Sequence, residues 1–215
     1  MGLEIDHVFI WTAPGAPEAD AVLAAGLVEG SPNRHEGQGT ANRRVFFQDS
    51  MLEFLWVEHE DEARGAPAEK LLLWDRWSRR GSGACPFGIC FRGTEEKPPF
   101  TSWLYAPPYS PSGIHIAIDS SDPEQPLLFY FSVPAKWSRP GSEPRYHPAG
   151  MRKLTDVRLS GPSSSRLSAI KALADYGSRV LVRESPTFLL ELAFDGEPRG
   201  LLHDARPSLP LRLSW

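Results

Sequence analysis

The most informative run of hydrophobic and polar positions is Met51–Glu58, which reads Met-Leu-Glu-Phe-Leu-Trp-Val-Glu. Apolar residues on both faces of a strand are typical of a strand that is buried on both sides. Because side chains alternate along a strand, Leu52, Phe54 and Trp56 should point one way and Glu53 the other. A charged and unpaired carboxylate among apolar neighbours costs several kcal/mol. Glu53 therefore needs a metal ion, a cation, a shell of hydrogen bonds or a proton.

The first predicted strand, Leu3–Trp11, raises the same question. Its alternation places Ile5, His7, Phe9 and Trp11 on one face. A histidine therefore also stands on an apolar face, on a strand distant in sequence from the carboxylate.

The periodic patterns predict strands throughout the chain and few helices. In the first quarter we expect a strand, a helix and three strands: Leu3–Trp11, Glu18–Ala25, Leu27–Arg34, Arg43–Gln48 and Met51–Glu58. In the middle we expect a helix and four short strands: Glu69–Arg80, Pro86–Arg92, Thr101–Ala106, Gly113–Asp119 and Leu127–Val133. In the last third we expect a strand, a helix and two strands: Leu154–Leu159, Ser163–Tyr176, Arg179–Arg183 and Thr187–Phe194. Residues 134–150 and 197–215 are rich in Pro and are predicted to be a loop and a tail that packs on the sheet edge.

Length and composition fit an ordinary soluble domain. The 215 residues suffice for one large domain or two small ones, and a net charge of −4 gives no reason to expect nucleic-acid binding. Cys85 and Cys90 lack the usual zinc spacing and form no disulfide framework, so we expect two core thiols. No signal peptide or membrane span is predicted, and a cytoplasmic location is the expectation.

Two segments of the chain repeat each other. Ser50-Met-Leu-Glu-Phe-Leu-Trp aligns with Phe188-Leu-Leu-Glu-Leu-Ala-Phe, which sets Glu53 opposite Glu191. A strand–helix–strands unit used twice predicts two modules that pair into one curved sheet with a central cleft. The predicted organisation is a single domain, 1–215, divided as follows: module one 1–60, a helix and central strands 69–133, a loop 134–150, module two 151–196 and the tail 197–215.

Three motifs resemble those of a known superfamily. They are Ile5-Asp-His-Val, the loop Arg34-His-Glu-Gly-Gln-Gly-Thr-Ala-Asn-Arg43, and Leu52-Glu-Phe-Leu. The chain resembles the glyoxalase-like domain proteins of the vicinal oxygen chelate superfamily, with a close match over about residues 3–60. The resemblance implies an α+β fold of paired βαβββ modules, forming a curved mixed sheet around a cleft that often holds a divalent metal.

The resemblance also implies metal ligands. By motif position His7 and Glu53 match one ligand pair, and Glu191 matches the second glutamate. Asp156 stands where a second His or Gln would be, which leaves His115 as the best substitute ligand. Such a set suits Zn, Mn, Fe or Ni without selecting among them. The alternatives are a polar site without a metal and a structural His–Glu hydrogen bond.

The glycine-containing loop is the second candidate for function. His35 and Glu53 are the expected catalytic residues, because histidine titrates near neutrality and suits proton transfer. The expected substrate-binding residues are Thr40, Asn42, Arg43 and Trp56. Gly37 and Gly39 also allow a simpler interpretation, in which the loop residues serve only the turn.

The predicted function is that of a glyoxalase-like small-molecule enzyme of the lyase, isomerase or dioxygenase type. A metal or a metal-free polar cluster would stabilise an enolate or oxyanion of an oxygenated metabolite. The alternatives are a binding or sequestering protein that uses the same cleft, and a structural domain whose cleft has decayed. The resemblance allows a homodimer, and neither nucleic acid nor a membrane is expected as a partner.

Overall fold

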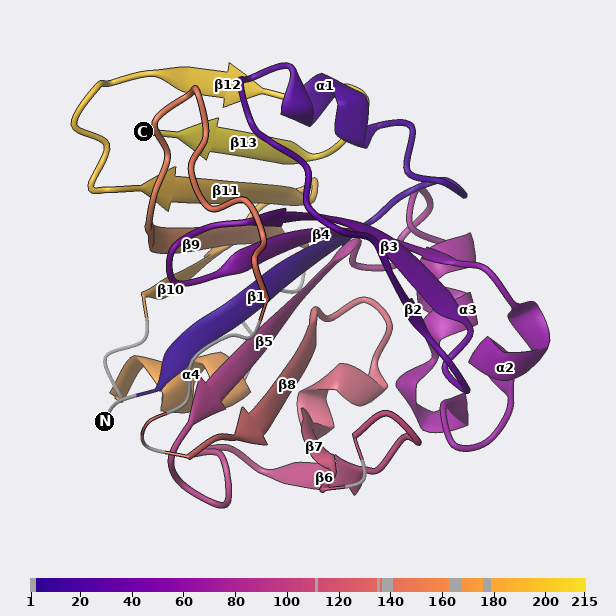
Figure 1. Ribbon diagram of the computed structural model, residues 1–215. Helices are drawn as coiled ribbons and strands as arrows, with labels where there is room; N and C mark the ends of the chain where they lie inside the picture. Colours follow the sequence, from indigo (N-terminus) through magenta and orange to yellow (C-terminus); the bar gives the residue numbers. More distant parts are fainter. Residues whose placement is uncertain (1–2, 111, 135, 137–140, 163–167, 176–178) are drawn as a thin grey trace.

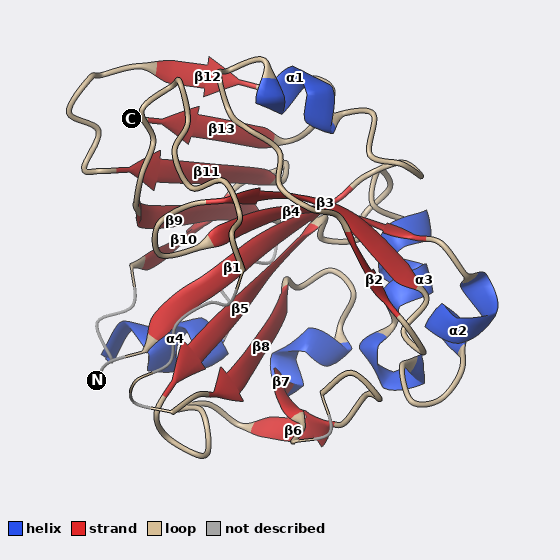
Figure 2. Ribbon diagram, in the orientation of Figure 1, coloured by secondary structure: helices blue, strands red, loops and turns tan. Residues whose placement is uncertain are grey.

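The computed structural model describes residues 3–110, 112–134, 136, 141–162, 168–175 and 179–215. Its strands form two mixed sheets, accompanied by short helices (Figures 1 and 2). The larger sheet has eight strands in the order β2-β3-β4-β1-β5-β8-β7-β6. These strands are β1 (Glu4–Trp11), β2 (Asn33–His35), β3 (Thr40–Phe46), β4 (Met51–Val57), β5 (Phe87–Gly93), β6 (Ser102–Tyr105), β7 (Ile114–Ala117) and β8 (Leu127–Ser132).

The eight-stranded sheet consists of two similar halves. In the first half β1 runs parallel to β4, and β3 and β2 follow antiparallel. In the second half β5 runs parallel to β8, and β7 and β6 follow antiparallel. The halves meet where β1 pairs antiparallel with β5. The fold is therefore α+β, with a curved mixed sheet of paired modules, as predicted, although only the first half has the helix of a βαβββ unit.

The half that pairs with residues 1–60 lies at 87–132, in the region predicted to hold central strands. Residues 151–196, predicted to be the second module, contribute instead to the other sheet. The residue patterns describe single strands and do not encode which strands pair across long distances. The short strands of 87–132 also have no helix between β5 and β6, so the unit was not recognised as a repeat.

The second sheet has five strands in the order β10-β9-β11-β13-β12. They are β9 (Leu154–Gly161), β10 (Val180–Glu184), β11 (Leu189–Phe194), β12 (Leu202–Asp204) and β13 (Leu211–Ser214). The predicted tail 197–215 is thus part of the sheet, and β13 lies between β11 and β12. Proline residues break this segment into strands too short to show a clear period, although Leu211 and Leu213 alternate with polar residues.

The helices are short. They are α1 (Ala19–Leu23), α2 (Glu60–Arg64), the 3-10 helix η1 (Glu69–Leu71), α3 (Leu73–Ser78), the 3-10 helix η2 (Ile118–Ser121) and α4 (Ser168–Asp175). The single helix predicted for Glu69–Arg80 is interrupted at Leu72, whose φ of 55° is left-handed. The helix predicted for Ser163–Tyr176 is confirmed over 168–175, and its remaining residues lie outside the described part of the chain.

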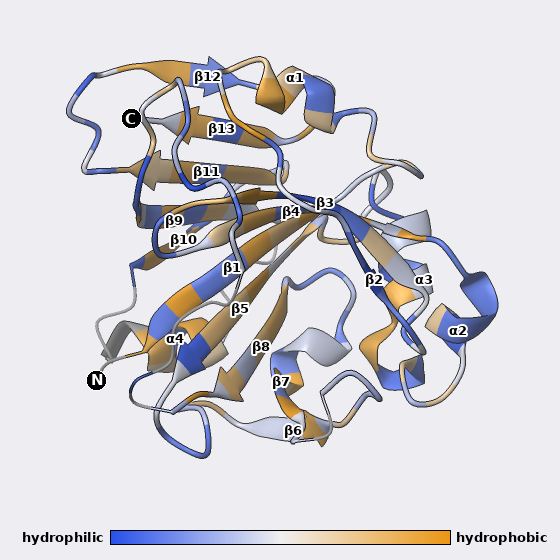
Figure 3. Cartoon of the chain, in the orientation of Figure 1, coloured by the Kyte–Doolittle hydropathy of each residue, from blue (hydrophilic) through white to orange (hydrophobic). Residues whose placement is uncertain are grey.

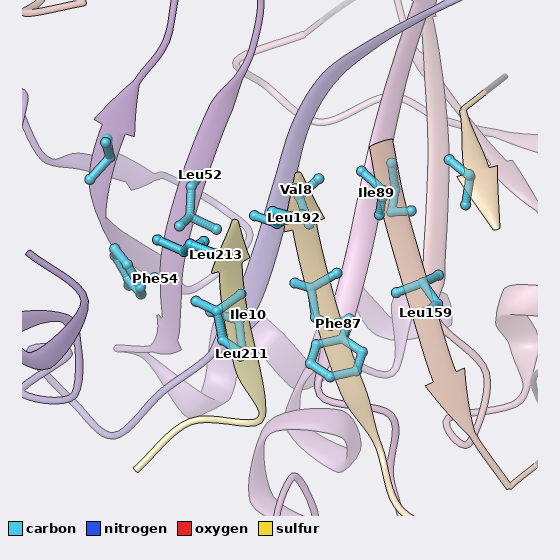
Figure 4. Close-up of a cluster of buried hydrophobic side chains, with 14 of the residues drawn as sticks. Val8, Ile10, Leu52, Phe54, Phe87, Ile89, Leu159, Leu192, Leu211 and Leu213 are labelled. Atoms are coloured by element: carbon cyan, nitrogen blue, oxygen red, sulfur yellow. The ribbon is translucent and has the colours of Figure 1, made fainter. Parts of the chain in front are cut away.

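The hydrophobic core lies between the two sheets (Figure 4). From the eight-stranded sheet Val8, Ile10 and Leu52 face the second sheet, where Leu192 and Leu213 belong to the same cluster. The opposite face of the eight-stranded sheet carries a second apolar cluster, which includes side chains of α2, η1 and α3. β4 is therefore buried on both faces, as predicted, and β4, β5 and β8 are mostly apolar (Figure 3).

A β-bulge in β1 changes the predicted facing of its first residues. Ile5 pairs with Phe91 and His7 with Cys90, so Asp6 is an extra residue without an opposite partner. Ile5 consequently packs against the core between the sheets, and not beside His7 as predicted. The alternation holds from His7 onward.

Candidate functional site

A cavity of about 130 Å³ lies on the face of the eight-stranded sheet that looks away from the second sheet. Its walls come from both halves of the sheet and from η1 and α3, so the curved sheet surrounds it. Most of the lining is apolar or aromatic. The polar lining groups are His7 on β1, Glu53 on β4, Cys90 on β5, His35 and Gln38 at the β2–β3 connection, and the hydroxyls of Tyr105 and Tyr109, which donate to Gln38.

His7 is fixed by a chain of charged groups. Its Nδ1 lies 2.8 Å from Asp6 Oδ1, and Asp6 Oδ2 accepts a hydrogen bond of 2.8 Å from Arg92 Nη1. Burial by itself lowers the pKa of His7, but the contact with Cys90, the charge of Glu53 and the hydrogen bond to Asp6 raise it well above its ordinary value, whereas burial raises the pKa of the Cys90 thiol. Because Nδ1 is held by Asp6, Nε2 is the ring nitrogen left for Cys90 and the cavity. The site therefore favours a protonated His7.

Glu53 is the polar group with the fewest partners in the cavity. It is 5% exposed, and within the described part of the chain its carboxylate receives no hydrogen bond. Arg44 lies opposite Glu53 on β3, but its guanidinium bonds to Ser31 O, 2.7 Å from Nε. Within the described residues, the predicted need of Glu53 for a partner is met by the nearby rings of His7 and His35, whose pKa values its charge raises.

His35 is held by an uncharged partner, whereas His7 is held by a carboxylate. Its Nδ1 lies 2.9 Å from Thr40 Oγ1, which also accepts a hydrogen bond of 2.8 Å from Gln38 Nε2. Gln38 Oε1 accepts a further hydrogen bond from the Tyr109 hydroxyl, and the Tyr109 ring lies 5.5 Å from the His35 ring. Burial lowers the pKa of His35, and the charge of His7 lowers it further against the opposing effect of Glu53. One cavity thus favours a charged His7 and a neutral His35.

The predicted metal ligands do not come together. His7 and Glu53 line the cavity, but His115 points away from the cavity-lining Ile114 and Ile116 and bonds to Ser102 Oγ at 3.1 Å. Glu191 lies on β11 of the other sheet, 3.7 Å from Arg212 Nη1. Among the residues that the structure describes, no three His, Cys, Asp or Glu side chains are grouped closely enough to hold a metal ion. The donor set here does not fit the metal site that the resemblance implies.

The predicted substrate-binding residues lie outside the cavity lining. Trp56 packs toward the core between the sheets, and Arg43 forms a bidentate ion pair of 2.7 Å with Glu29. Asn42 is fully buried, and its Oδ1 accepts a hydrogen bond from a β2 amide. Thr40 acts indirectly, because it positions His35 and Gln38. Alternation predicts the face of each residue but not the direction that a long side chain takes.

Several residues of the site were not predicted. Asp6 precedes His7 in the sequence, and regular alternation would send it to the other face. Cys90 is buried, as expected for a core thiol, but its position on the cavity face, directly opposite His7 across the strand pair, was not predicted. Tyr105 and Tyr109 carry no sequence signal that would have placed them beside a loop some 70 residues away.

Comparisons with known proteins agree with the fold. No family model matches the sequence, and no curated protein matches it significantly. A hypothetical protein from Staphylococcus aureus is similar in structure with a TM-score of 0.55 at 9% identity, over 100% of this chain and 99% of that one. A hypothetical protein from Bacillus halodurans matches 65% of this chain and 100% of its own, with a TM-score of 0.38 at 14% identity. A triple mutant of 4-hydroxymandelate synthase from Streptomyces coelicolor matches 100% of this chain and 62% of its own, with a TM-score of 0.45 at 10% identity.

None of the helices in the described residues is long and apolar enough to cross a membrane. At 9% identity, the similarity to the Staphylococcus aureus protein concerns the fold alone, and it extends over the whole length of both chains.

Proposed function

We propose that this protein is a glyoxalase-like enzyme that uses acid–base catalysis by its own side chains to move a proton at the carbon beside a carbonyl group. The observation that carries the proposal is the pairing, in one apolar cavity, of an Asp6-bound His7 with a buried Glu53 that receives no hydrogen bond from the described residues. The same cavity raises the pKa of His7 and lowers that of His35, and groups whose environments push their protonation in opposite directions are typical of acid–base sites.

His7 is the proposed acid. Protonated His7 donates a hydrogen bond from Nε2 to the carbonyl oxygen of the substrate, where negative charge develops as the neighbouring proton leaves. Asp6 is a positioning residue, since it holds Nδ1 at 2.8 Å and keeps Nε2 turned to the cavity. Arg92 holds Asp6 in turn, through the 2.8 Å bond to Oδ2.

Glu53 is the proposed base. Its carboxylate takes a proton from the carbon beside the carbonyl, the C–H electron pair becomes a C=C bond, and the carbonyl π electrons move to the oxygen held by His7. Return of the proton to the same carbon restores the substrate, and return to a different carbon gives an isomer. The step balances without an oxidant, a reductant or a second substrate.

His35 is proposed to orient the substrate. A neutral imidazole keeps one nitrogen for Thr40 and presents the other to a ligand oxygen. The Thr40–Gln38–Tyr109 chain fixes the ring over the cavity.

The second candidate is a binding protein without catalysis, which the apolar lining of the cavity favours. Both candidates use the same cavity, and they differ only in whether Glu53 exchanges a proton with the ligand.

The test is proton exchange in D2O, followed by NMR for a panel of ketones from acetone to cyclohexanone and acetophenone. We expect the wild type to accelerate deuterium uptake beside the carbonyl of at least one ketone, and Glu53→Gln to lower that rate about 100-fold or more. Glu191→Gln is the matched control, because it removes the aligned glutamate in the other sheet, and it should keep the wild-type rate.

An equal rate in Glu53→Gln and wild type would contradict the proposed role of Glu53. Binding of a ketone without any deuterium exchange would indicate a binding protein without catalysis, which is the second candidate.

A further inference from the structure

We propose that the ligand of this cavity is a small, uncharged ring with a single carbonyl oxygen, of the size of cyclohexanone. The carbonyl group rests on the proposed function. The limits on size, shape and charge come from the cavity itself, and they hold whether or not the protein is a catalyst.

Size is the first limit. The cavity measures about 130 Å³. Apolar cavities of ~150 Å³ in proteins accept benzene. The space therefore suits a ligand of about six or seven non-hydrogen atoms, and it is too small to enclose a nucleotide, a sugar phosphate or a glutathione adduct.

Shape is the second limit. The rings of Phe9 and Phe129 lie 5.9 Å apart with an interplanar angle of 24°, and both line the cavity. The His7 ring meets Phe129 edge-on at 5.8 Å. These rings offer broad apolar surfaces beside the acid, which a compact ring fills better than a flexible chain of the same size.

Charge is the third limit. None of the described residues that line the cavity is a lysine or an arginine. An anion would meet the buried Glu53 without a compensating cation other than His7, which already faces the carboxylates of Asp6 and Glu53. A cation would be attracted by Glu53 but repelled by a protonated His7. Because an unpaired buried charge costs several kcal/mol, an uncharged ligand is favoured.

The distribution of polar groups sets the number of ligand oxygens. Glu53, His7 and Cys90 lie on the adjacent strands β4, β1 and β5, and His35 and Gln38 come from one connection. The walls from β7, η1 and α3 contribute only apolar side chains, such as Ile116, Leu71 and Leu73. A ligand with one oxygen facing the polar wall and hydrocarbon elsewhere matches both the polar and the apolar wall of the cavity.

The test is a binding series on the full chain, measured by ligand-observed NMR and tryptophan fluorescence. Cyclohexanone, cyclohexanecarboxylate and cyclohexylammonium share one ring and differ in charge, and cyclododecanone exceeds the cavity. We expect cyclohexanone to bind at least about tenfold more tightly than each of the other three. Equal or tighter binding of the anion, the cation or the large ring would overturn the inference.

Two variants locate the binding. Ile116→Trp fills the cavity without removing a polar group, and should weaken cyclohexanone binding at least about tenfold. Ile118→Trp is the matched control, because Ile118 is 49% exposed and does not line the cavity. Unchanged binding in a folded Ile116→Trp variant would place the ligand elsewhere and overturn the inference.

Glu53→Gln separates this inference from the proposed function. It should stop proton exchange, keep cyclohexanone binding, and tighten the binding of cyclohexanecarboxylate, because the repelling charge is gone. Selective binding of cyclohexanone without exchange in the wild type would support the ligand class and overturn the catalysis. Exchange of acyclic ketones with no binding of cyclohexanone would support the catalysis and overturn the ligand class.

Discussion

At the residue scale, the site depends on neighbours that fix the protonation of two histidines. His7 is held by Asp6 and faces Glu53, whereas His35 is held by a hydroxyl and faces the charge of His7. The first arrangement favours the charged ring and the second the neutral ring. The chemistry proposed here follows from this difference, since an acid and a neutral hydrogen-bonding group are needed at the same pH.

The two histidines should affect stability with opposite dependence on pH. The pKa of His7 is higher in the folded protein than in the unfolded chain, so its charged form stabilises the fold below about pH 6.5, and this stabilisation is lost as pH rises through the folded-state pKa. The destabilisation caused by His7→Gln should therefore shrink as pH rises.

The pKa of His35 is lowered in the folded protein, so the wild type should lose stability relative to His35→Gln as pH falls below about 6.5. Urea unfolding of the wild type and both variants from pH 5 to 9 measures this. Parallel pH profiles for the two variants would contradict the assigned protonation states.

Sequence alternation set His7 and Glu53 each on an apolar face of its own strand, and the resemblance paired them, but neither was sufficient for the rest of the site. Asp6 reaches His7 only because a bulge interrupts β1, and a bulge has no period to detect. His115 and Glu191 also stand in strands with apolar neighbours. In the structure His115 lies on the face of β7 that points away from the cavity, and Glu191 lies on β11 of the other sheet.

At the element scale, the floor of the cavity depends on close contact between β1 and β5. Gly88 lies opposite Phe9, and a Cβ atom on Gly88 would come within 2.1 Å of the Phe9 ring. The absence of a side chain at this position lets the Phe9 ring lie across β5 toward Phe129. The glycine is therefore a packing requirement of the site.

Gly88→Ala should lower the free energy of unfolding by about 1–3 kcal/mol, because the Phe9 ring or the backbone must move. The same change at Gly81, where a Cβ would meet nothing within 4 Å, is the control. Thermal and urea unfolding measure the free energy of unfolding of both variants. Equal stability of the two would show that Phe9 is free to move aside.

Arg76 ties α3 to the segment that leads into β8. Its buried guanidinium donates to Gln125 O at 2.6 Å, to Ser120 O at 2.5 Å and to Leu71 O at 3.2 Å. Burial lowers its pKa to about 10, and the carbonyl oxygens replace the water that the cation loses. This residue supports the cavity walls without touching the cavity.

Arg76→Met should cost about 3–5 kcal/mol, since it leaves several buried carbonyls without a donor. Arg79→Met, at the exposed C-cap of the same helix, should change the free energy of unfolding by less than about 0.5 kcal/mol. Urea unfolding compares the two, and similar values would mean that water replaces the guanidinium.

Element boundaries were predicted well where patterns are long and poorly where they are short. β1, β4 and β5 were located within a few residues, because each is seven or eight residues long and has buried residues on both faces. The helix predicted for Glu69–Arg80 has the right apolar residues, but a left-handed residue at Leu72 divides it, and no composition signal marks that position.

At the scale of the whole molecule, the second sheet supports the first. The hydrophobic core between the two sheets contains residues of both, and these residues come from the entire length of the chain (Figure 4). The sequence predicted two paired modules but assigned the wrong segment to the second one, because strand pairing depends on the assembled core. The final strands complete that core and are not an appended tail.

Leu211→Ala tests this role of the last strand. Leu211 is fully buried on β13, so its truncation should cost about 2–5 kcal/mol. Leu202→Ala, at a position that is 62% exposed on β12, should change stability by less than about 0.5 kcal/mol. Thermal unfolding measures the loss of stability in both variants. Equal losses for Leu211→Ala and Leu202→Ala would contradict the proposed role of β13 in the core.

The opposite protonation of the two histidines is tested most directly by an NMR titration of the ring nitrogens of His7 and His35 in one sample of the wild type. We predict that His7 titrates well above the ordinary histidine pKa of about 6.5 and His35 below it. We further predict that Asp6→Asn moves the His7 titration downward. Two histidines that titrate together near the ordinary value, or in the reverse order, would contradict the opposite protonation.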